Sequence, residues 1–374
     1  MLLLPLIEPY RSLSIIGMCK NAGKTTVLNS ILSEMGTTGK TLGLTSIGRD
    51  GESVDVVTQT HKPGIYVREG TLIATAFEML KYCDISREIV ETTGFPTPLG
   101  EVVLVRARSD GNVQLAGPSI TAQLAKLSGM FFALGADVAI VDGALSRKTL
   151  CAPAVSEATI LCTGASYSRD IDTVIEDTAF ATLLLTLPEQ ADFSEEERAA
   201  CPGKALFRME DGTLRALPQE LQLADALRSQ AYAGVRAVYV AGAVTDALLK
   251  PVLMAGKRFD GLTLSAEDGS KLLIHQDTYD KLLLRGISLA VARATRVAAI
   301  TVNPFSAYGF DLDKEELRSR MQARVRVPVI NVLEDLNLED MAWRADDRAR
   351  IAAREEAEQN ADHSHCCGNE EITL

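Results

Sequence analysis

The feature that most restricts the fold is a strand, a glycine-containing loop and a helix that follow one another near the start of the chain. The apolar run SLSIIG, from Ser12, has the length and character of a buried strand. The segment KTTVLNSILSEMG then places its apolar side chains on one helical stripe that ends at Gly36. A second apolar run, TLGLTSI from Thr41, follows within the length of one crossover. We therefore expect a right-handed parallel unit.

The alternation of buried strands with amphipathic helices continues along the chain. Further apolar runs begin at Glu101, Asp137 and Ala158, and apolar residues between 120 and 134 recur at the spacings of a helix packed on a sheet. The predicted fold class is α/β, with a mainly parallel sheet. The opening segment MLLLPLI is broken by Pro5, and we expect it to pack as a short strand.

Changes of composition divide the chain into four segments. Residues 1–187 form the predicted core, and the charged, proline-broken stretch 188–230 is an insertion or linker with a hairpin that turns at Asp211-Gly212. The alternation of strands and helices resumes over 231–335, which we assign to a C-terminal α/β lobe, although periodicity alone leaves open whether these strands extend the first sheet or form a second domain. Residues 336–374 are an acidic helix followed by a polar tail rich in His and Cys.

Net charge and apolar runs limit the partners. The 38 basic and 50 acidic residues give a net charge of −12, which disfavours a nucleic-acid partner. No run reaches the roughly 18 apolar residues that a membrane helix needs. The scattered cysteines predict reduced thiols rather than a disulfide framework. From these features we expect a cytoplasmic protein with no membrane contact.

The loop GMCKNAGKTT, from Gly17 to Thr26, lies between the first strand and its helix, which is the context of a phosphate-binding loop. Backbone N–H groups of such a loop and the positive end of the helix dipole converge on phosphate oxygens. We predict that Lys24 contacts the β and γ phosphates, and that the Thr25 hydroxyl ligates Mg²⁺. The alternative is a Gly-Lys-Thr helix start by chance. The spacing also departs from the usual pattern, because five residues separate Gly17 from Gly23.

The fold prediction is thus a P-loop NTPase core, with ATP and Mg²⁺ as cofactors. The residues that we assign to nucleotide binding all belong to this loop and the first turn of the helix: Gly17, Lys20, Asn21, Ala22, Gly23, Lys24, Thr25 and Thr26. Lys20 either adds a second positive charge at the phosphates or is a solvated loop lysine.

Carboxylates follow two of the predicted strands. Asp142 ends VAIVD and is a candidate magnesium ligand, directly or through water; the alternative is an aspartate that caps a turn. Asp50 and Glu52 follow the second strand, at the edge where open α/β sheets bind ligands. Either side chain positions water or metal, or both belong to a solvated turn. We assign catalytic roles to Lys24, Asp142 and Asp50.

The C-terminal tail gathers four potential metal ligands: His363, His365, Cys366 and Cys367. Imidazole and thiolate are the donors that zinc, nickel, cobalt and copper prefer. Their spacing does not match a structural zinc finger. The tail therefore either binds a transition metal loosely or is simply solvated.

Several segments together resemble one family, the small P-loop subunit of the lysine 5,6-aminomutase reactivase, within the dethiobiotin synthetase-like branch of P-loop proteins. The resemblance covers roughly the first 165 residues. It is carried by GMCKNAGKTTVLN, GLTSIGRDGE, KPGIYVREGTLIATA, TPLGEVVLVRARSDGNVQLAGPS and VDGALSRKTL.

This resemblance implies a function and two partners. The family member acts with a second, larger ATPase subunit that resembles mismatch-repair proteins. The pair restores an adenosylcobalamin-dependent aminomutase by exchanging damaged cofactor, so this chain is expected to be an ATPase with a chaperone-like role. Two alternatives share the loop: an ATP-dependent ligase of the dethiobiotin synthetase type, and a nucleotide-dependent switch protein with little turnover.

Overall fold

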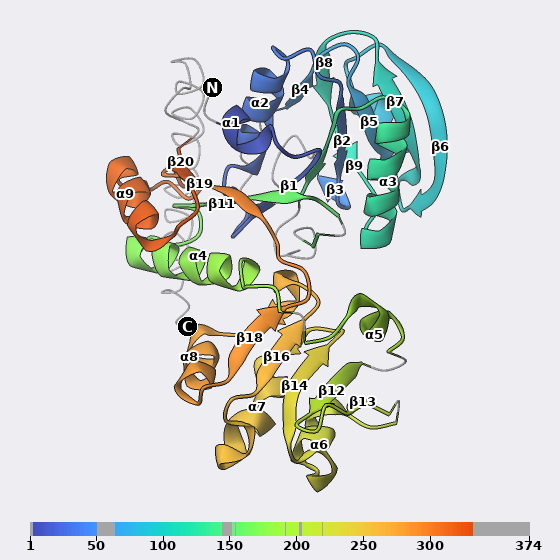
Figure 1. Ribbon diagram of the computed structural model, residues 1–374. Helices are drawn as coiled ribbons and strands as arrows, with labels where there is room; N and C mark the ends of the chain where they lie inside the picture. The colour runs from blue at the N-terminus through green and yellow to red at the C-terminus, as the bar shows by residue number, and fades with distance from the viewer. Residues whose placement is uncertain are drawn as a thin grey trace, which may run out of the picture.

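The strands of the chain form two main sheets with helices packed on them (Figure 1). The computed structural model describes residues 3–50, 64–143, 152–153, 155–190, 192–201, 204–218 and 220–331. We call the larger sheet with its helices the large lobe. The small lobe comprises the described residues from 204 to 291, which carry the smaller sheet.

The larger sheet is mainly parallel, as the sequence predicts. Its strand order is β20-β19-β11-β1-β10-β2-β5-β7-β6, and all neighbours from β20 to β5 run parallel. Only β7 and β6, at one edge, are antiparallel to their neighbours. The strands are β1 (Ser12–Gly17), β2 (Leu42–Ser46), β5 (Leu72–Ala76), β6 (Arg87–Thr97), β7 (Gly100–Ala107), β10 (Val138–Asp142), β11 (Ala158–Gly164), β19 (Val297–Asn303) and β20 (Val329–Ile330). The central strands are buried on both faces, which explains their continuous apolar runs.

Helices cover both faces of this sheet. Helices α1 (Leu4–Ile7) and α2 (Lys24–Met35) share one core with the strands, while α3 (Thr121–Ala133), α4 (Ile171–Leu185) and α9 (Lys314–Arg324) pack on the opposite face. Gly43 of β2 admits the ring of Phe131 from α3, since a Cβ there would lie 2.5 Å from the ring. No helix in the described part of the chain is both long and apolar enough to cross a bilayer.

Short paired strands and a 3₁₀ helix border the described part of the large lobe. The strands are β3 (Arg49–Asp50), β4 (Ile65–Val67), β8 (Gly111–Val113) and β9 (Leu115–Ala116), and the 3₁₀ helix is η1 (Phe77–Tyr82). β3 pairs with β9 and β4 pairs with β8, both antiparallel.

The opening segment is a helix, so the predicted strand is wrong. Leu3 and Ile7 are four residues apart and both buried, which matches one face of a helical turn. Pro5 occupies a first-turn position, where its missing N–H costs nothing. The Glu34 carboxylate of α2 accepts hydrogen bonds from the N–H groups of Leu3 and Leu4, at 3.3 and 2.9 Å. This distant partner favours the helix, and local apolar pattern could not reveal it.

The smaller sheet has the order β13-β12-β14-β16-β18, in which β14, β16 and β18 are parallel. Its strands are β12 (Ala205–Met209), β13 (Leu214–Ala216), β14 (Val235–Val240), β16 (Thr263–Ala266) and β18 (Ser288–Val291). The helices associated with it are α5 (Glu195–Ala199), α6 (Leu223–Arg228), α7 (Asp246–Met254) and α8 (Gln276–Leu284), with 3₁₀ helices η3 (Gln230–Tyr232), η4 (Gly256–Phe259) and η5 (Gly269–Lys271). A parallel pair, β15 (Val244–Thr245) and β17 (Leu272–Leu273), precedes α7 and α8.

Strand pairing groups the chain differently from the predicted ranges. The expected hairpin is present: β12 and β13 are antiparallel, with Gly212 between them at φ 82°. However, β12 also pairs with β14, so the sheet extends from the range 188–230 into the range 231–335. The strands β19 and β20, which lie in 231–335, belong to the larger sheet. Apolar periodicity identifies strands but carries no information about distant partners, which is why the sequence did not separate these two groups.

Candidate functional site

The loop between β1 and α2 has two residues in the left-handed region of backbone space. Asn21 has φ 57° and Gly23 has φ 91°, and these are the residue types that adopt this conformation most readily. Gly17, where β1 ends, lies under the side chain of Lys24: a Cβ there would be 3.1 Å from Lys24 Nζ and 3.1 Å from the Cys19 carbonyl oxygen. The glycines thus allow the loop to curl tightly around the lysine.

The N-terminus of α2 presents donors and no acidic group. Gly23 is the N-cap residue, no side chain caps the helix, and the first turn contains no acidic residue. The first N–H groups of a helix have no intrahelical acceptor, and the helix dipole makes this end positive. This helix end therefore favours an anion.

Lys24, the first residue of α2, adds a full positive charge at the same point. Its Nζ donates a hydrogen bond to the Cys19 carbonyl oxygen at 3.4 Å, within the loop itself. It forms no ion pair with any residue that the structure describes. The loop is anchored to the sheet by the Met18 N–H, which donates to the Cys162 carbonyl of β11 at 2.8 Å.

Asp142 lies at the same edge of the sheet. It is the last residue of β10, is buried, and is paired in register with Ile15 of β1 and Ser46 of β2. The next N–H, that of Gly143, donates to the Ile15 carbonyl at 2.8 Å. Since β1 runs only two residues beyond Ile15, the carboxyl ends of β1 and β10 bring Asp142 to the base of the β1–α2 loop.

Asp50 follows the neighbouring strand. Its backbone lies in β3, four residues beyond Ser46, and pairs with Leu115 of β9. The backbone of Asp50 is thus at the carboxyl side of β2, the predicted edge. Glu52 lies outside the described residues.

Two thiols, one in the loop and one in the neighbouring strand β11, have strongly raised pKa values. Burial raises the pKa of Cys19 to about 11, although the positive charge of Lys24 opposes the shift. Burial likewise raises the pKa of Cys162 to about 12, although a hydrogen bond with the Thr301 hydroxyl and the positive charge of Lys24 oppose the shift. Both thiols therefore stay protonated and neutral at physiological pH.

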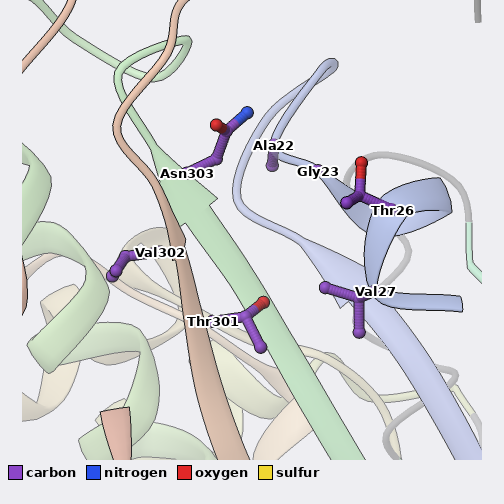
Figure 2. A pocket seen from close by; sticks show the side chains of 7 residues that line it. All are labelled: Ala22, Gly23, Thr26, Val27, Thr301, Val302 and Asn303. Atoms are coloured by element: carbon purple, nitrogen blue, oxygen red, sulfur yellow. The ribbon is translucent and has the colours of Figure 1, made fainter. Parts of the chain in front are cut away.

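A small pocket opens beside the loop, and β19 contributes one of its walls. It is lined by Ala22, Gly23, Thr26, Val27, Thr301, Val302 and Asn303, and Figure 2 shows Asn303 extending from the end of its strand toward the loop. Asn303 Nδ2 donates to the Asn21 carbonyl at 3.4 Å, and a Cβ on Gly23 would lie 3.4 Å from the Asn303 Cβ.

Sequence reasoning missed Thr301 and Asn303. A signal was present, because Asn303 ends an apolar strand just as Asp142 does. The strand VAAITV lies in the range 231–335, and its apolar pattern alone cannot tell whether it extends the first sheet or belongs to a separate lobe. Once β19 is placed in the larger sheet, its carboxyl end lies on the opposite side of the loop from Asp142, separated from β1 by β11.

The structure brings together most of the predicted site residues. Gly17 to Thr26 form one loop and helix start; Thr25 and Thr26 are half-buried in the first turn of α2, and Thr26 lines the pocket. Lys20 is exposed in the loop and makes no ion pair with a described residue, so both of its predicted roles, at the phosphates or as a solvated lysine, stay predictions. The tail ligands His363, His365, Cys366 and Cys367 lie outside the described residues.

The donor set suits phosphate and a weakly coordinated hard cation. Backbone N–H groups, an ammonium and a hydroxyl surround the helix end, and one carboxylate lies at the base. Mg²⁺ is usually held by one or two protein oxygens together with phosphate and water. Among the described residues, no three His, Cys, Asp or Glu side chains form a cluster that would hold a metal by themselves. Comparisons with protein-family models, curated proteins and solved structures found no match.

Proposed function

We propose that the chain binds a nucleoside triphosphate, ATP, with Mg²⁺ at the β1–α2 loop, and hydrolyses it. The observation that supports this most strongly is the start of α2. This helix end has no side-chain cap and no acidic residue, and it carries Lys24 beside a tightly curled loop. A phosphate group bound there gains backbone donors, the helix dipole and a full positive charge.

Each residue of the site then has a distinct task. Lys24 moves from the Cys19 carbonyl to the β and γ phosphates, and the N–H groups of residues 21–25 bind phosphate oxygens. Thr25 and Asp142 would hold Mg²⁺, Asp142 directly or through water. When bound, the ion neutralises charge that develops on the phosphates. Asp50 is the proposed residue that orients the attacking water.

The resemblance of the first 165 residues supports a more specific role. We propose that ATP turnover by this chain, together with a second ATPase subunit, reactivates an adenosylcobalamin-dependent aminomutase of the lysine 5,6-aminomutase type. Binding and hydrolysis of ATP move a client only if the two nucleotide states bind it with different affinity. Hydrolysis resets the cycle, so that damaged cofactor leaves and intact cofactor enters.

A reconstitution experiment tests this role. Aminomutase inactivated during turnover is mixed with both ATPase subunits, Mg²⁺ and fresh cofactor, and the recovery of its activity is followed. We expect recovery with ATP, at most one round of exchange with a non-hydrolysable analogue, and none with Lys24→Ala. Equally fast recovery without nucleotide would eliminate the reactivase proposal. ATP hydrolysis that is stimulated by a small carboxylic acid, without a cobalamin enzyme, would instead favour a ligase.

A further inference from the structure

Helix α4 packs into the cores of both lobes. Val174, Ile175 and Leu185 belong to the core of the larger sheet. Leu184, at the end of the helix, belongs instead to the core of the small lobe, and Phe180 packs against the same core. The helix is therefore a shared structural element, and Figure 1 shows it lying between the two sheets.

The C-terminal end of α4 is pressed directly against the small lobe. Gly269 of η5 approaches so closely that a Cβ on it would lie 2.4 Å from the Leu184 carbonyl oxygen and 2.6 Å from the Leu185 Cα. The ring of Phe180 meets that of Tyr279, from α8, edge to face with centroids 5.8 Å apart. Because the close atoms at Gly269 are backbone, this contact has little freedom to adjust.

The other end of α4 begins beside the candidate nucleotide site. The segment 164–170 links β11 to α4, and the Ala165 N–H donates to the Asn303 carbonyl at 2.8 Å. Gly164 has a φ of 151°, and a Cβ on it would lie 1.9 Å from the same carbonyl oxygen. The Asn303 side chain, in turn, contacts the β1–α2 loop at Asn21. Asp170 then caps α4.

From these contacts we infer that α4 couples the nucleotide site to the small lobe. A change of the β1–α2 loop that moves Asn303 also moves the segment 164–170, because the two backbones are in contact. The rigid helix carries this movement to Gly269 and Tyr279. The packing of the small lobe on α4 thus depends on whether nucleotide is bound, and this packing changes nucleotide affinity in return. This inference rests on the proposed nucleotide site.

Thermodynamic linkage makes the coupling measurable from either end. If nucleotide shifts the chain between two packings of the small lobe on α4, then a substitution that destabilises one packing more than the other changes nucleotide affinity. Couplings of this kind typically correspond to about 5- to 150-fold in affinity. A substitution far from the phosphates should therefore change nucleotide binding without touching the loop.

Gly269→Ala provides such a substitution, and Gly242→Ala is its matched control. The first places a Cβ against the backbone of α4, whereas a Cβ on Gly242, also in the small lobe, meets nothing within 4 Å. We expect Gly269→Ala to change the Kd for ATP in the presence of Mg²⁺ by about fivefold or more. Gly242→Ala should bind ATP as the unmodified chain does.

Hydrogen exchange on the unmodified full-length chain gives a second test that does not depend on the folding of a variant. Addition of ATP and Mg²⁺ should change amide exchange in 269–284, which contains η5 and α8, as well as in the β1–α2 loop. Exchange that changes in the loop alone, or a Gly269→Ala variant that folds and binds ATP with unaltered Kd, would overturn the coupling and leave the nucleotide site standing. Absence of ATP binding to the unmodified chain would overturn both.

Discussion

The two lobes each contain a parallel strand followed by a loop and a helix, but the two helix starts are built differently. In the small lobe, the Thr245 hydroxyl caps α7 by accepting from the Leu248 N–H at 3.3 Å, and Asp246 occupies the first turn. His275 Nδ1 lies 2.6 Å from Asp246 Oδ2. In the large lobe, α2 begins at Lys24 with no side-chain cap and no acidic residue.

The difference shows which helix end is available to an external anion. At α7 the chain supplies its own acceptor, the Thr245 hydroxyl, and its own negative charge, Asp246. Burial raises the pKa of Asp246, but hydrogen bonds from Thr278 and His275 outweigh burial and hold this pKa below its usual value. The carboxylate thus stays charged at the positive end of its helix. At α2 the corresponding positions hold glycine and lysine. One topology therefore gives a self-satisfied helix start in one lobe and a phosphate-binding candidate in the other.

The largest effect is expected from Lys24→Ala, which removes the charge that distinguishes α2 from α7. We expect ATP hydrolysis to fall by at least about 100-fold and ATP binding to weaken, because the transition-state charge loses its cationic partner. Lys250→Ala, at an exposed position of α7, is the matched control and should keep full turnover. Steady-state hydrolysis and thermal melting of both variants provide the check. Normal turnover by a folded Lys24→Ala protein would refute the assignment of the loop.

A smaller effect is expected from Asp142→Asn. The carboxylate is proposed to act on magnesium or water rather than on the phosphates, so turnover should fall about 10- to 100-fold while ATP affinity changes less. Measurement of kcat and of the ATP dissociation constant separates the two effects. Equal activity in the two proteins would make Asp142 a residue of the turn alone.

Gly23→Ala, with Gly39→Ala as its control, tests whether the left-handed backbone at the start of α2 contributes to ATP binding as well as to stability. Both glycines have positive φ, 91° and 73°, so each variant should lose about 1–2 kcal/mol of unfolding free energy. Only Gly23 has neighbours, since a Cβ on Gly39 meets nothing within 4 Å. Urea titration should show similar losses for the two, with ATP binding weakened only in Gly23→Ala. Equal ATP affinity in the two variants would contradict a role for the loop geometry.

The smallest effect concerns pH, through a thiol of the β1–α2 loop. Burial raises the pKa of Cys19 from 9.0 to about 11. A raised pKa means that the stabilising contribution is complete below pH 9 and is lost as pH rises toward 11. Cys19→Ser should therefore lose less stability than the unmodified chain over this window. Thermal melts at pH 8 to 11 measure the difference, and parallel losses in the two proteins would show that Cys19 does not contribute.

Local sequence pattern identified the elements of the site but not all of their neighbours. The strands ending at Gly17 and Asp142, the helix from Lys24 and the hairpin at Gly212 were predicted because glycine, apolar runs and turn residues act over a few positions. The helix at Leu4–Ile7 was missed because Glu34 stabilises it from a distance. Asn303 was missed because the pairing of β19 with β11 joins segments far apart in the sequence.

The most direct test of the central claim is a crystal structure of the full chain with Mg²⁺ and a non-hydrolysable ATP analogue. The account predicts that the β and γ phosphates lie at the start of α2, within hydrogen-bond reach of the N–H groups of residues 21–25. Lys24 Nζ should have left the Cys19 carbonyl for a phosphate oxygen, and the metal should lie beside Thr25. A nucleotide bound elsewhere, or a β1–α2 loop that stays unchanged and empty at saturating analogue, would contradict it.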